Sequence, residues 1–256
     1  MTTGHVVARL AAAEPIGLSE LDEAAALQQR VDTKYLIGLE EFDRIADKLA
    51  ATHRRLVIGD RRAFDYRSSY LDTPGLTCFH DHRQGRRLRF KARTRSYDRG
   101  LCRFEVKLKD GRGGTDKHAL RVGPADFGTV PGGATGFLTY VLADRYGIAA
   151  PAVTPRLLVR HFRQTLVAKS AASPCRVTLD TDLTFTTGSV TAGLRTGLLL
   201  VETKSARGRG PADELLRRAG ARPVSISKYC AGMALLHPGL PEQPWRNLLR
   251  RYFELS

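Results

Sequence analysis

Much of the chain alternates between hydrophobic and polar positions, with the two-residue period of half-buried β-strands. The segment Arg87–Arg95 is the clearest case, because Leu88, Phe90 and Ala92 alternate there with cationic residues. This period predicts strands over residues 32–37, 55–58, 64–71, 87–95, 102–109, 115–122, 156–167, 176–179, 183–190 and 198–204. So many strands favour a closed antiparallel barrel, because closure removes exposed sheet edges.

Apolar residues at helical spacing occupy shorter stretches. Ser19 is the expected cap of a short helix that reaches Leu27, and residues 39–50 place Phe42, Ile45 and Leu49 on one face of a second helix. Further helices are expected over residues 137–146, 212–219, 226–236 and 245–253. The last is basic and amphipathic; it is expected to pack against the barrel, with a membrane surface or a partner as the alternative. The Gly- and Pro-rich segment 123–136 is expected to link two halves of the domain.

A short internal echo supports two related halves. Leu71-Asp72-Thr73 precedes a Glu-x-Lys strand at Glu105, and Leu179-Asp180-Thr181 precedes another at Glu202. Chance similarity is the alternative explanation, since the spacing is too loose for a solenoid.

The charge of the chain narrows its possible partners. It has 256 residues with 41 Lys and Arg against 26 Asp and Glu, for a formal net charge of +15, and its 42% hydrophobic content is ordinary for a folded protein. Such a surplus indicates a polyanionic partner: nucleic acid, an anionic membrane or a phosphate-rich small molecule.

Segments that would direct the chain to other compartments are missing from the sequence. No apolar run is long enough for a membrane span, and residues 1–17 lack the features of a signal peptide. The four cysteines form no Cys-x-x-Cys pair, which argues against a zinc site or a disulfide framework. A cytoplasmic location is therefore expected, with a peripheral position at the inner face of the membrane as an extension of it.

Alternation also gathers the charges on single strand faces. Lys91, Arg93 and Arg95 share a face with Arg87 and Arg89, opposite the apolar residues of that strand. The same pattern groups Arg103 with Glu105, Lys107 and Lys109, Asp32 with Lys34, Arg156 with Arg160, Arg176 with Asp180, and Glu202 with Lys204. If helices cover the apolar faces, the barrel becomes a cationic tunnel. Solvated strand faces are the alternative.

A tunnel of this kind needs an anion to relieve the repulsion among its cations. Guanidinium groups match phosphate oxygens in pairs, and carboxylates among them suit Mg²⁺ or Mn²⁺ bridging phosphates. Glu105 and Glu202 are the candidate metal ligands, with salt bridges to Lys107 and Lys204 as the alternative. The basic loop 110–117 is expected to close over a phosphate chain or to be only a hairpin loop, and no Walker-type phosphate loop is present.

At these residues the sequence resembles the VTC domain, the polyphosphate polymerase branch of the triphosphate tunnel (CYTH-like) superfamily. The ordered matches cover about residues 30 to 235. They are Thr33-Lys34-Tyr35-Leu36, Tyr70-Leu71-Asp72-Thr73, Lys91-Ala92-Arg93-Thr94-Arg95, Phe104-Glu105-Val106-Lys107, Val159-Arg160-His161-Phe162, Arg176-Val177-Thr178-Leu179-Asp180-Thr181, Val201-Glu202-Thr203-Lys204 and Ser227-Lys228-Tyr229.

This resemblance implies an α+β protein with an antiparallel tunnel of about eight strands flanked by helices. It implies a tunnel domain over residues 30–236, after an N-terminal helical segment 1–29 and before a basic amphipathic tail 237–256. By motif position, the expected phosphate-binding and catalytic residues are Lys34, Arg93, Arg95, Lys107, Arg160, Arg176 and Lys228, with Lys204 added to the binding set. Glu202 falls at the position of the family's metal carboxylate, and Lys228 is selected by the resemblance alone.

The implied function is an ATP-dependent polyphosphate polymerase, a metal-dependent phosphotransferase that uses Mn²⁺ or Mg²⁺. It would move the γ-phosphate of ATP to a growing inorganic polyphosphate chain, with a membrane protein as a further expected partner for the product. A tunnel triphosphatase is the first alternative, but its usual Glu-x-Glu-x-Lys is reduced here to Asp32-Thr33-Lys34. A non-catalytic polyanion binder is the second. Nucleic acid is not expected, because Phe90 and Phe104 lie opposite the cations and base stacking needs exposed aromatics beside them.

Overall fold

A computed structural model describes residues 2–24, 31–98, 100–110, 114–206 and 208–255 of the chain. Its helices are α1 (Thr2–Arg9), α2 (Leu18–Ala24), α3 (Leu39–Thr52), α4 (Thr77–Arg83), α5 (Ala134–Tyr146), α6 (Pro211–Arg218), α7 (Lys228–Leu236) and α8 (Arg246–Tyr252), with a 3₁₀ turn η1 (Pro124–Asp126). Its strands are β1 (Pro15–Ile16), β2 (Val31–Gly38), β3 (His53–Leu56), β4 (Phe64–Asp72), β5 (Arg89–Tyr97), β6 (Leu101–Lys109), β7 (Thr115–Val122), β8 (Thr154–Ala168), β9 (Cys175–Thr187), β10 (Val190–Leu194), β11 (Leu198–Ser205) and β12 (Phe253–Leu255).

The chain divides into two compact units that share the long strands β8 and β9. Unit 1 consists of residues 1–64, 161–183 and 194–226, and its strands follow the order β2, β11, β9, β8, β3, β1. In this unit β11 runs antiparallel to β2 and β9, β3 runs antiparallel to β8, and the short β1 is parallel to β3. Unit 1 is therefore a mainly antiparallel sheet.

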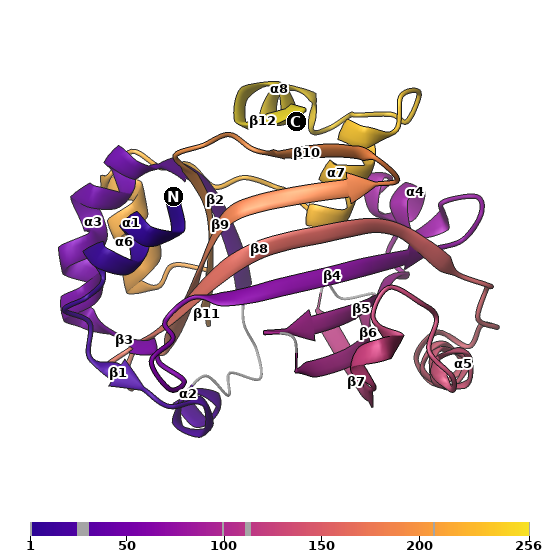
Figure 1. The fold of residues 1–256 in the computed structure, drawn as a ribbon, viewed down its shortest axis with the longest axis horizontal. Helices are drawn as coiled ribbons and strands as arrows, with labels where there is room; N and C mark the ends of the chain where they lie inside the picture. Colours follow the sequence, from indigo (N-terminus) through magenta and orange to yellow (C-terminus); the bar gives the residue numbers. More distant parts are fainter. Residues whose placement is uncertain (1, 25–30, 99, 111–113, 207, 256) are drawn as a thin grey trace. The chain divides into compact units, whose positions relative to one another are not determined.

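Three helices, α1, α3 and α6, cover one face of the unit 1 sheet (Figure 1). Phe42 and Ile45 of α3 pack there against Tyr35 of β2 and Val201 of β11, all nearly inaccessible to solvent. Because β-strand side chains alternate, the residues between these apolar positions lie on the opposite face of the sheet. The apolar faces thus pack under helices, as the alternation predicts.

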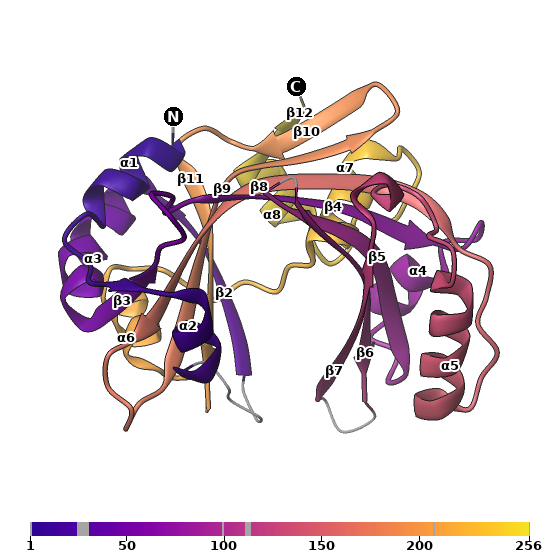
Figure 2. The same ribbon diagram turned by 60° about the horizontal axis from the view of Figure 1, so that its bottom comes forward.

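Unit 2 consists of residues 65–160, 184–193 and 227–256, with strand order β12, β10, β9, β8, β4, β5, β6, β7. Strands β4 to β7 form a regular antiparallel series in chain order. Helix α5 lies along β6, where Phe137 meets Phe104 edge to face at 6.1 Å (Figure 2). The C-terminal helix α8 belongs to this unit and buries Leu249, while Phe253 of the following strand β12 stacks on Phe185 at 5.7 Å. The helix therefore packs on unit 2 through Leu249, and contact with a membrane surface or a partner stays a prediction.

The elements differ from the sequence expectation in a few places. Residues 176–179 and 183–190, expected as two strands, belong largely to one strand, β9, and Val190 begins β10. Helices α1 and α4 are not predicted by the pattern, and β5 begins at Arg89, so Arg87 precedes it. The segment 123–136 contains η1 and the start of α5 inside unit 2, so it is not a plain linker. The expected end of the first helix, near Leu27, lies outside the described residues.

The fold class is α+β with a large, mainly antiparallel sheet. Closure into a tunnel of about eight strands stays a prediction, as do the domain limits at residues 30 and 236. In the described part of the chain, every helix is too short or too polar to cross a membrane.

Candidate anion-binding site

On unit 2, positively charged side chains lie directly opposite one another across strands β5, β6 and β7. Arg95 lies opposite Arg103, which lies opposite Arg121, and these three residues form one cross-strand row. A second row consists of Lys91, Lys107 and Lys117. Directly opposed like charges destabilise a sheet, and two such rows are the reverse of the usual mixture of signs. This face, called here the basic face of unit 2, is therefore suited to an anionic ligand.

Glu105 lies between the two rows as their buried counter-charge. Its side chain is 2% exposed, and one carboxylate oxygen accepts hydrogen bonds from Arg93 at 2.6 and 2.8 Å. Arg95 Nη1 lies 3.8 Å from that same oxygen. Lys117 Nζ lies 2.5 Å from the other oxygen, which also accepts a hydrogen bond from the Tyr97 hydroxyl at 2.9 Å. Three cations thus surround a single carboxylate, which leaves the cluster with a positive surplus.

The pKa directions follow from this enclosure. Burial disfavours the Glu105 carboxylate, but Arg93, Arg95 and Lys117 outweigh burial and hold its pKa well below the usual range. Burial, followed by repulsion from Arg93, lowers the pKa of Arg95. Burial also lowers the pKa of Lys117 despite the attraction of Glu105. The cations carry an electrostatic cost that an added phosphate group would reduce.

Tyr70 connects this cluster to helix α7. Its hydroxyl accepts a hydrogen bond from Arg93 at 2.7 Å, and its ring stacks on that of Tyr229 at 5.2 Å. Burial opposes ionisation of Tyr70, but Arg93, Arg95, Lys228 and Lys91 together lower its pKa to about 8. Lys228 immediately precedes Tyr229, whose ring stacks on Tyr70, so the start of α7 lies beside the β5 cations.

Two contacts fix the start of α7 in unit 2. Tyr229 donates to the buried Asp72 at 2.6 Å, and Lys91 donates to Ser227, the cap of the helix, at 2.7 Å. Asp72 also accepts backbone hydrogen bonds at the start of α4. Lys228 is thus the first residue of a helix whose position is set by buried polar contacts.

Unit 1 carries the remaining predicted residues on the face opposite its helices. Across the strands, Lys34 of β2 lies opposite Glu202 of β11, and Lys204 lies between Asp32 and Arg176. Lys204 Nζ contacts Glu202 and lies 2.8 Å from Asp32. The salt bridge considered as an alternative for Glu202 is therefore present. We call this group, Asp32, Lys34, Arg176, Glu202 and Lys204, the polar row of unit 1.

The two candidate metal ligands differ in how well they fit a divalent cation. Both oxygens of Glu105 are occupied by cations and a phenol, so its geometry does not fit a metal ligand. Glu202 and Asp32 converge on the ammonium of Lys204, and two carboxylates around one cation position fit a divalent ion that replaces it. Among the described residues, no group of three or more His, Cys, Asp or Glu side chains gathers as a ready-made metal site.

Arg160 is not brought together with the cluster around Glu105. It forms an ion pair with Asp65, both guanidinium contacts being 3.1 Å. Asp65 precedes Tyr66, which shares its face with Ser68 and Tyr70, so Asp65 lies on the opposite face of β4. Within unit 2, the predicted role of Arg160 in the phosphate site therefore lacks support from this geometry.

The structure adds residues that the sequence argument did not select. Arg163 binds Asp180 through two contacts of 2.6 and 2.7 Å, and the buried His161 lies 3.6 Å from the same carboxylate. Lys117, where the predicted loop 110–117 overlaps the predicted strand 115–122, lies in β7 and reaches Glu105. Alternation of Lys117 and Arg121 along residues 115–122 is the signal that could have identified this strand as a further cationic one.

The fold and this site define an α+β protein with basic sheet faces suited to phosphate-rich anions. Residues 29–237 match the VTC domain, and the chain belongs to the VTC domain family. No curated protein matches the chain. One similar solved structure is the crystal structure of the inorganic triphosphatase NE1496, with 14% sequence identity, coverage of 70% of this chain and 74% of that chain, and a TM-score of 0.26. A second is the crystal structure of the hypothetical protein NE1496, with 15% sequence identity, coverage of 69% of this chain and 76% of that chain, and a TM-score of 0.25. TM-scores this low support no conclusion about fold or activity.

Proposed function

We propose that this chain is an ATP-dependent polyphosphate polymerase. The observation that carries the proposal is the pair of like-charge rows on the basic face of unit 2, Lys91–Lys107–Lys117 and Arg95–Arg103–Arg121. A sheet gains nothing from such rows by itself, whereas a chain of phosphates neutralises them along their length. Membership of the VTC domain family supports a ligand of the polyphosphate or triphosphate class.

The chemistry proposed is transfer of the γ-phosphate of ATP to the end of a polyphosphate chain. A terminal oxygen of the chain attacks the γ-phosphorus, the bond to the β-phosphate oxygen breaks, and ADP leaves. The attacking oxygen is already anionic, so the reaction needs no dedicated general base. Its main difficulty is the repulsion between two anions, and positioned cations offset that repulsion.

Each cationic residue of the proposal binds or orients phosphates. Arg93, Arg95 and Arg176 would bind them through guanidinium groups, with Lys34, Lys107, Lys204 and Lys228 as point charges. Tyr70 and Glu105 orient Arg93 by direct hydrogen bonds. The closed tunnel predicted from the sequence is part of this proposal, and a structure with bound triphosphate tests it.

A divalent cation completes the proposal. Mn²⁺ or Mg²⁺ would bridge phosphate oxygens and neutralise part of their charge. Glu202 and Asp32 would hold it, because their carboxylates already converge on a cation, the ammonium of Lys204. Removing the metal with a chelator is expected to abolish turnover.

Incubation of the purified chain with ATP and Mn²⁺ tests the proposed activity. Long polyphosphate visible on a gel, with ADP formed in step, is the expected result. Free phosphate without polymer would identify a triphosphatase instead, and neither product would leave a non-catalytic polyanion binder.

Matched variants test the assignment of the site. Arg93→Ala is expected to slow polymer formation by roughly 10²–10³-fold, the usual loss for one charge-stabilising group. Arg246→Ala is the control, because Arg246 lies on the exposed surface of α8 in an ion pair with Glu242. Full activity in Arg93→Ala would show that the basic face of unit 2 is not the reaction site.

A further inference from the structure

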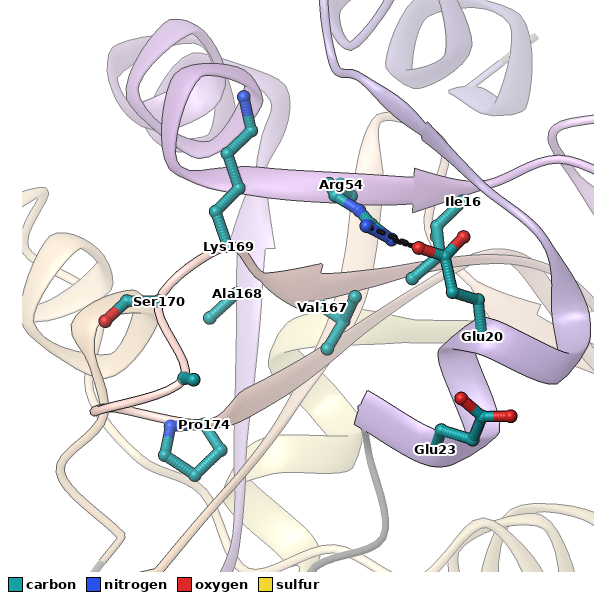
Figure 3. A pocket seen from close by; sticks show the side chains of 10 residues that line it. Ile16, Glu20, Glu23, Arg54, Val167, Ala168, Lys169, Ser170 and Pro174 are labelled. Carbon is teal, nitrogen blue, oxygen red and sulfur yellow. Dashed lines mark hydrogen bonds and ion pairs between the residues drawn. The ribbon is translucent and has the colours of Figure 1, made fainter.

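Unit 1 contains a pocket whose lining includes none of the residues of the proposed phosphate and metal sites. Its volume is about 430 Å³, within the range of small-molecule sites, roughly 300–1,000 Å³. Helix α2, strand β3, the end of β8 and the turn after β8 form its walls (Figure 3). The lining residues are Ile16, Glu20, Glu23, Arg54, Val167, Ala168, Lys169, Ser170, Ala171 and Pro174.

The strand order and the burial pattern place this pocket beside the polar row of unit 1. Strands β8 and β9 are neighbours in the sheet, and Arg54 of β3 lies opposite Val167 of β8. Leu166 of β8 and Cys175 and Val177 of β9 belong to the core under the helices, so Val167 and Arg176, which alternate with them, lie on the opposite face. Neighbouring strands lie about 4.8 Å apart. The wall formed by Val167 is therefore one strand away from Arg176.

The charges of the pocket differ from those of the basic faces. Two carboxylates, Glu20 and Glu23, balance two cations, Arg54 and Lys169, among the lining residues. Arg54 Nη1 donates to Glu20 at 2.7 Å, so its charge is already compensated, and Lys169 lies 3.2 Å from Glu14. A lining of balanced charge gives a phosphate chain no attraction, because each cation already has an anionic neighbour.

Apart from Ser170, the remaining lining is apolar. The side chains of Ile16 and Val167 are buried, and Ala168, Ala171 and Pro174 complete the apolar part of the wall. A pocket that combines apolar walls with a small number of polar groups is typical of small-molecule sites. The carboxylates of Glu20 and Glu23 at the rim can accept hydrogen bonds from hydroxyl or amino groups.

We propose that this pocket binds the nucleoside of a nucleoside triphosphate whose phosphates lie along Arg176 and Lys204. The inference rests on the proposed use of ATP and adds to it a specific place for the uncharged part of the molecule. Inorganic polyphosphate has no such part, so the pocket distinguishes the phosphate donor from the growing chain. Occupation of the pocket would orient the triphosphate with its γ-phosphate directed away from α2.

The test compares two ligands that differ only in the presence of a nucleoside. Titration calorimetry measures the dissociation constants of ATP and of inorganic tripolyphosphate, each with Mn²⁺. Ala171→Trp fills the pocket from its exposed rim, and Ala172→Trp, at the neighbouring exposed position outside the lining, is the matched control. Circular dichroism checks folding, and Ser170→Trp replaces Ala171→Trp if the latter does not fold.

The expected result is specific to ATP. Ala171→Trp should weaken ATP binding by about tenfold or more and leave tripolyphosphate within about twofold, while Ala172→Trp changes neither. Equal weakening of both ligands, or no change in either, would overturn the nucleoside pocket and leave the proposed polymerase standing. Wild-type protein that binds neither ligand would overturn the proposed function, and the pocket proposal with it.

Discussion

Replacing Glu105 by Gln removes the buried carboxylate that compensates Arg93, Arg95 and Lys117 in unit 2. The substitution keeps the size and shape of the side chain, so it changes charge and leaves packing nearly as it was. Arg93, Arg95 and Lys117 then remain close together without their shared counter-charge. The folded state should lose stability, because buried cations are costly when their partner is removed.

The structure sets the size of the effect. Glu105 is 2% exposed, and the side chains of Arg93 and Arg95 are 19% and 9% exposed, so solvent screens their interaction weakly. Breaking a buried pair of this kind costs about 3–5 kcal/mol. Lys117 is 45% exposed and can turn toward water, which places the expected loss near the lower end of that range.

Urea unfolding followed by tryptophan fluorescence measures this loss. The chain has a single tryptophan, Trp245, which is buried in unit 2, the unit that contains Glu105. Glu242→Gln is the control, since Glu242 forms an exposed ion pair with Arg246 that should contribute less than about 1 kcal/mol.

The dependence on pH gives a second signature. Burial opposes the charge of Glu105, but Arg93, Arg95 and Lys117 outweigh it and hold its pKa below the usual range. Its stabilisation is therefore complete above the unfolded-state value, about 4.3, and is lost as the pH falls toward the folded-state value. The difference between wild type and Glu105→Gln should narrow below about pH 4. A variant as stable as wild type at pH 7 would refute the view that Glu105 holds this cluster together.

Two further predictions concern buried hydroxyl and carboxyl groups. Tyr70, whose pKa is lowered to about 8, should titrate below the ordinary tyrosine value of about 10, so the folded state gains stability as the pH rises between these values. Tyrosinate absorbance should show a titration step near pH 8. Tyr70→Phe should remove this step, and the control Tyr140→Phe, at an exposed tyrosine, should keep it. A step near pH 8 that persists in Tyr70→Phe would contradict the placement of Arg93 beside the phenol. The buried Asp213 accepts hydrogen bonds from two hydroxyls and from the backbone at the start of α6, so Asp213→Ala should cost roughly 3 kcal/mol or more in urea unfolding. Glu214 is the next residue and is exposed, so Glu214→Ala should change the free energy of unfolding by well under 1 kcal/mol. Equal losses of stability in the two variants would show that the hydrogen bonds of Asp213 do not stabilise the start of α6.

The sequence by itself determined which residues share a strand face. Side-chain direction in a strand follows from the two-residue period, so Arg93 and Arg95, or Glu202 and Lys204, fall together whatever the partner strand is. The apolar residues between them then had to lie under helices, because a hydrophobic face is stable only when it is buried. The merging of residues 176–179 and 183–190 largely into β9 was less visible, since Asp180, Thr181 and Asp182 are typical of turns.

Only the tertiary structure decided which charges meet across strands. Residues two apart on one strand are nearly 7 Å apart, whereas directly opposed residues on neighbouring strands are about 4.5–5.5 Å apart, so register selects the partners across strands. Glu105 therefore binds Arg93, which lies directly opposite it on β5, and Lys117, its diagonal neighbour on β7, although Lys107 is nearer in sequence. Arg160 binds Asp65 outside the cluster. A sequence shows how charges alternate along each strand, but register depends on packing and turn geometry throughout the sheet.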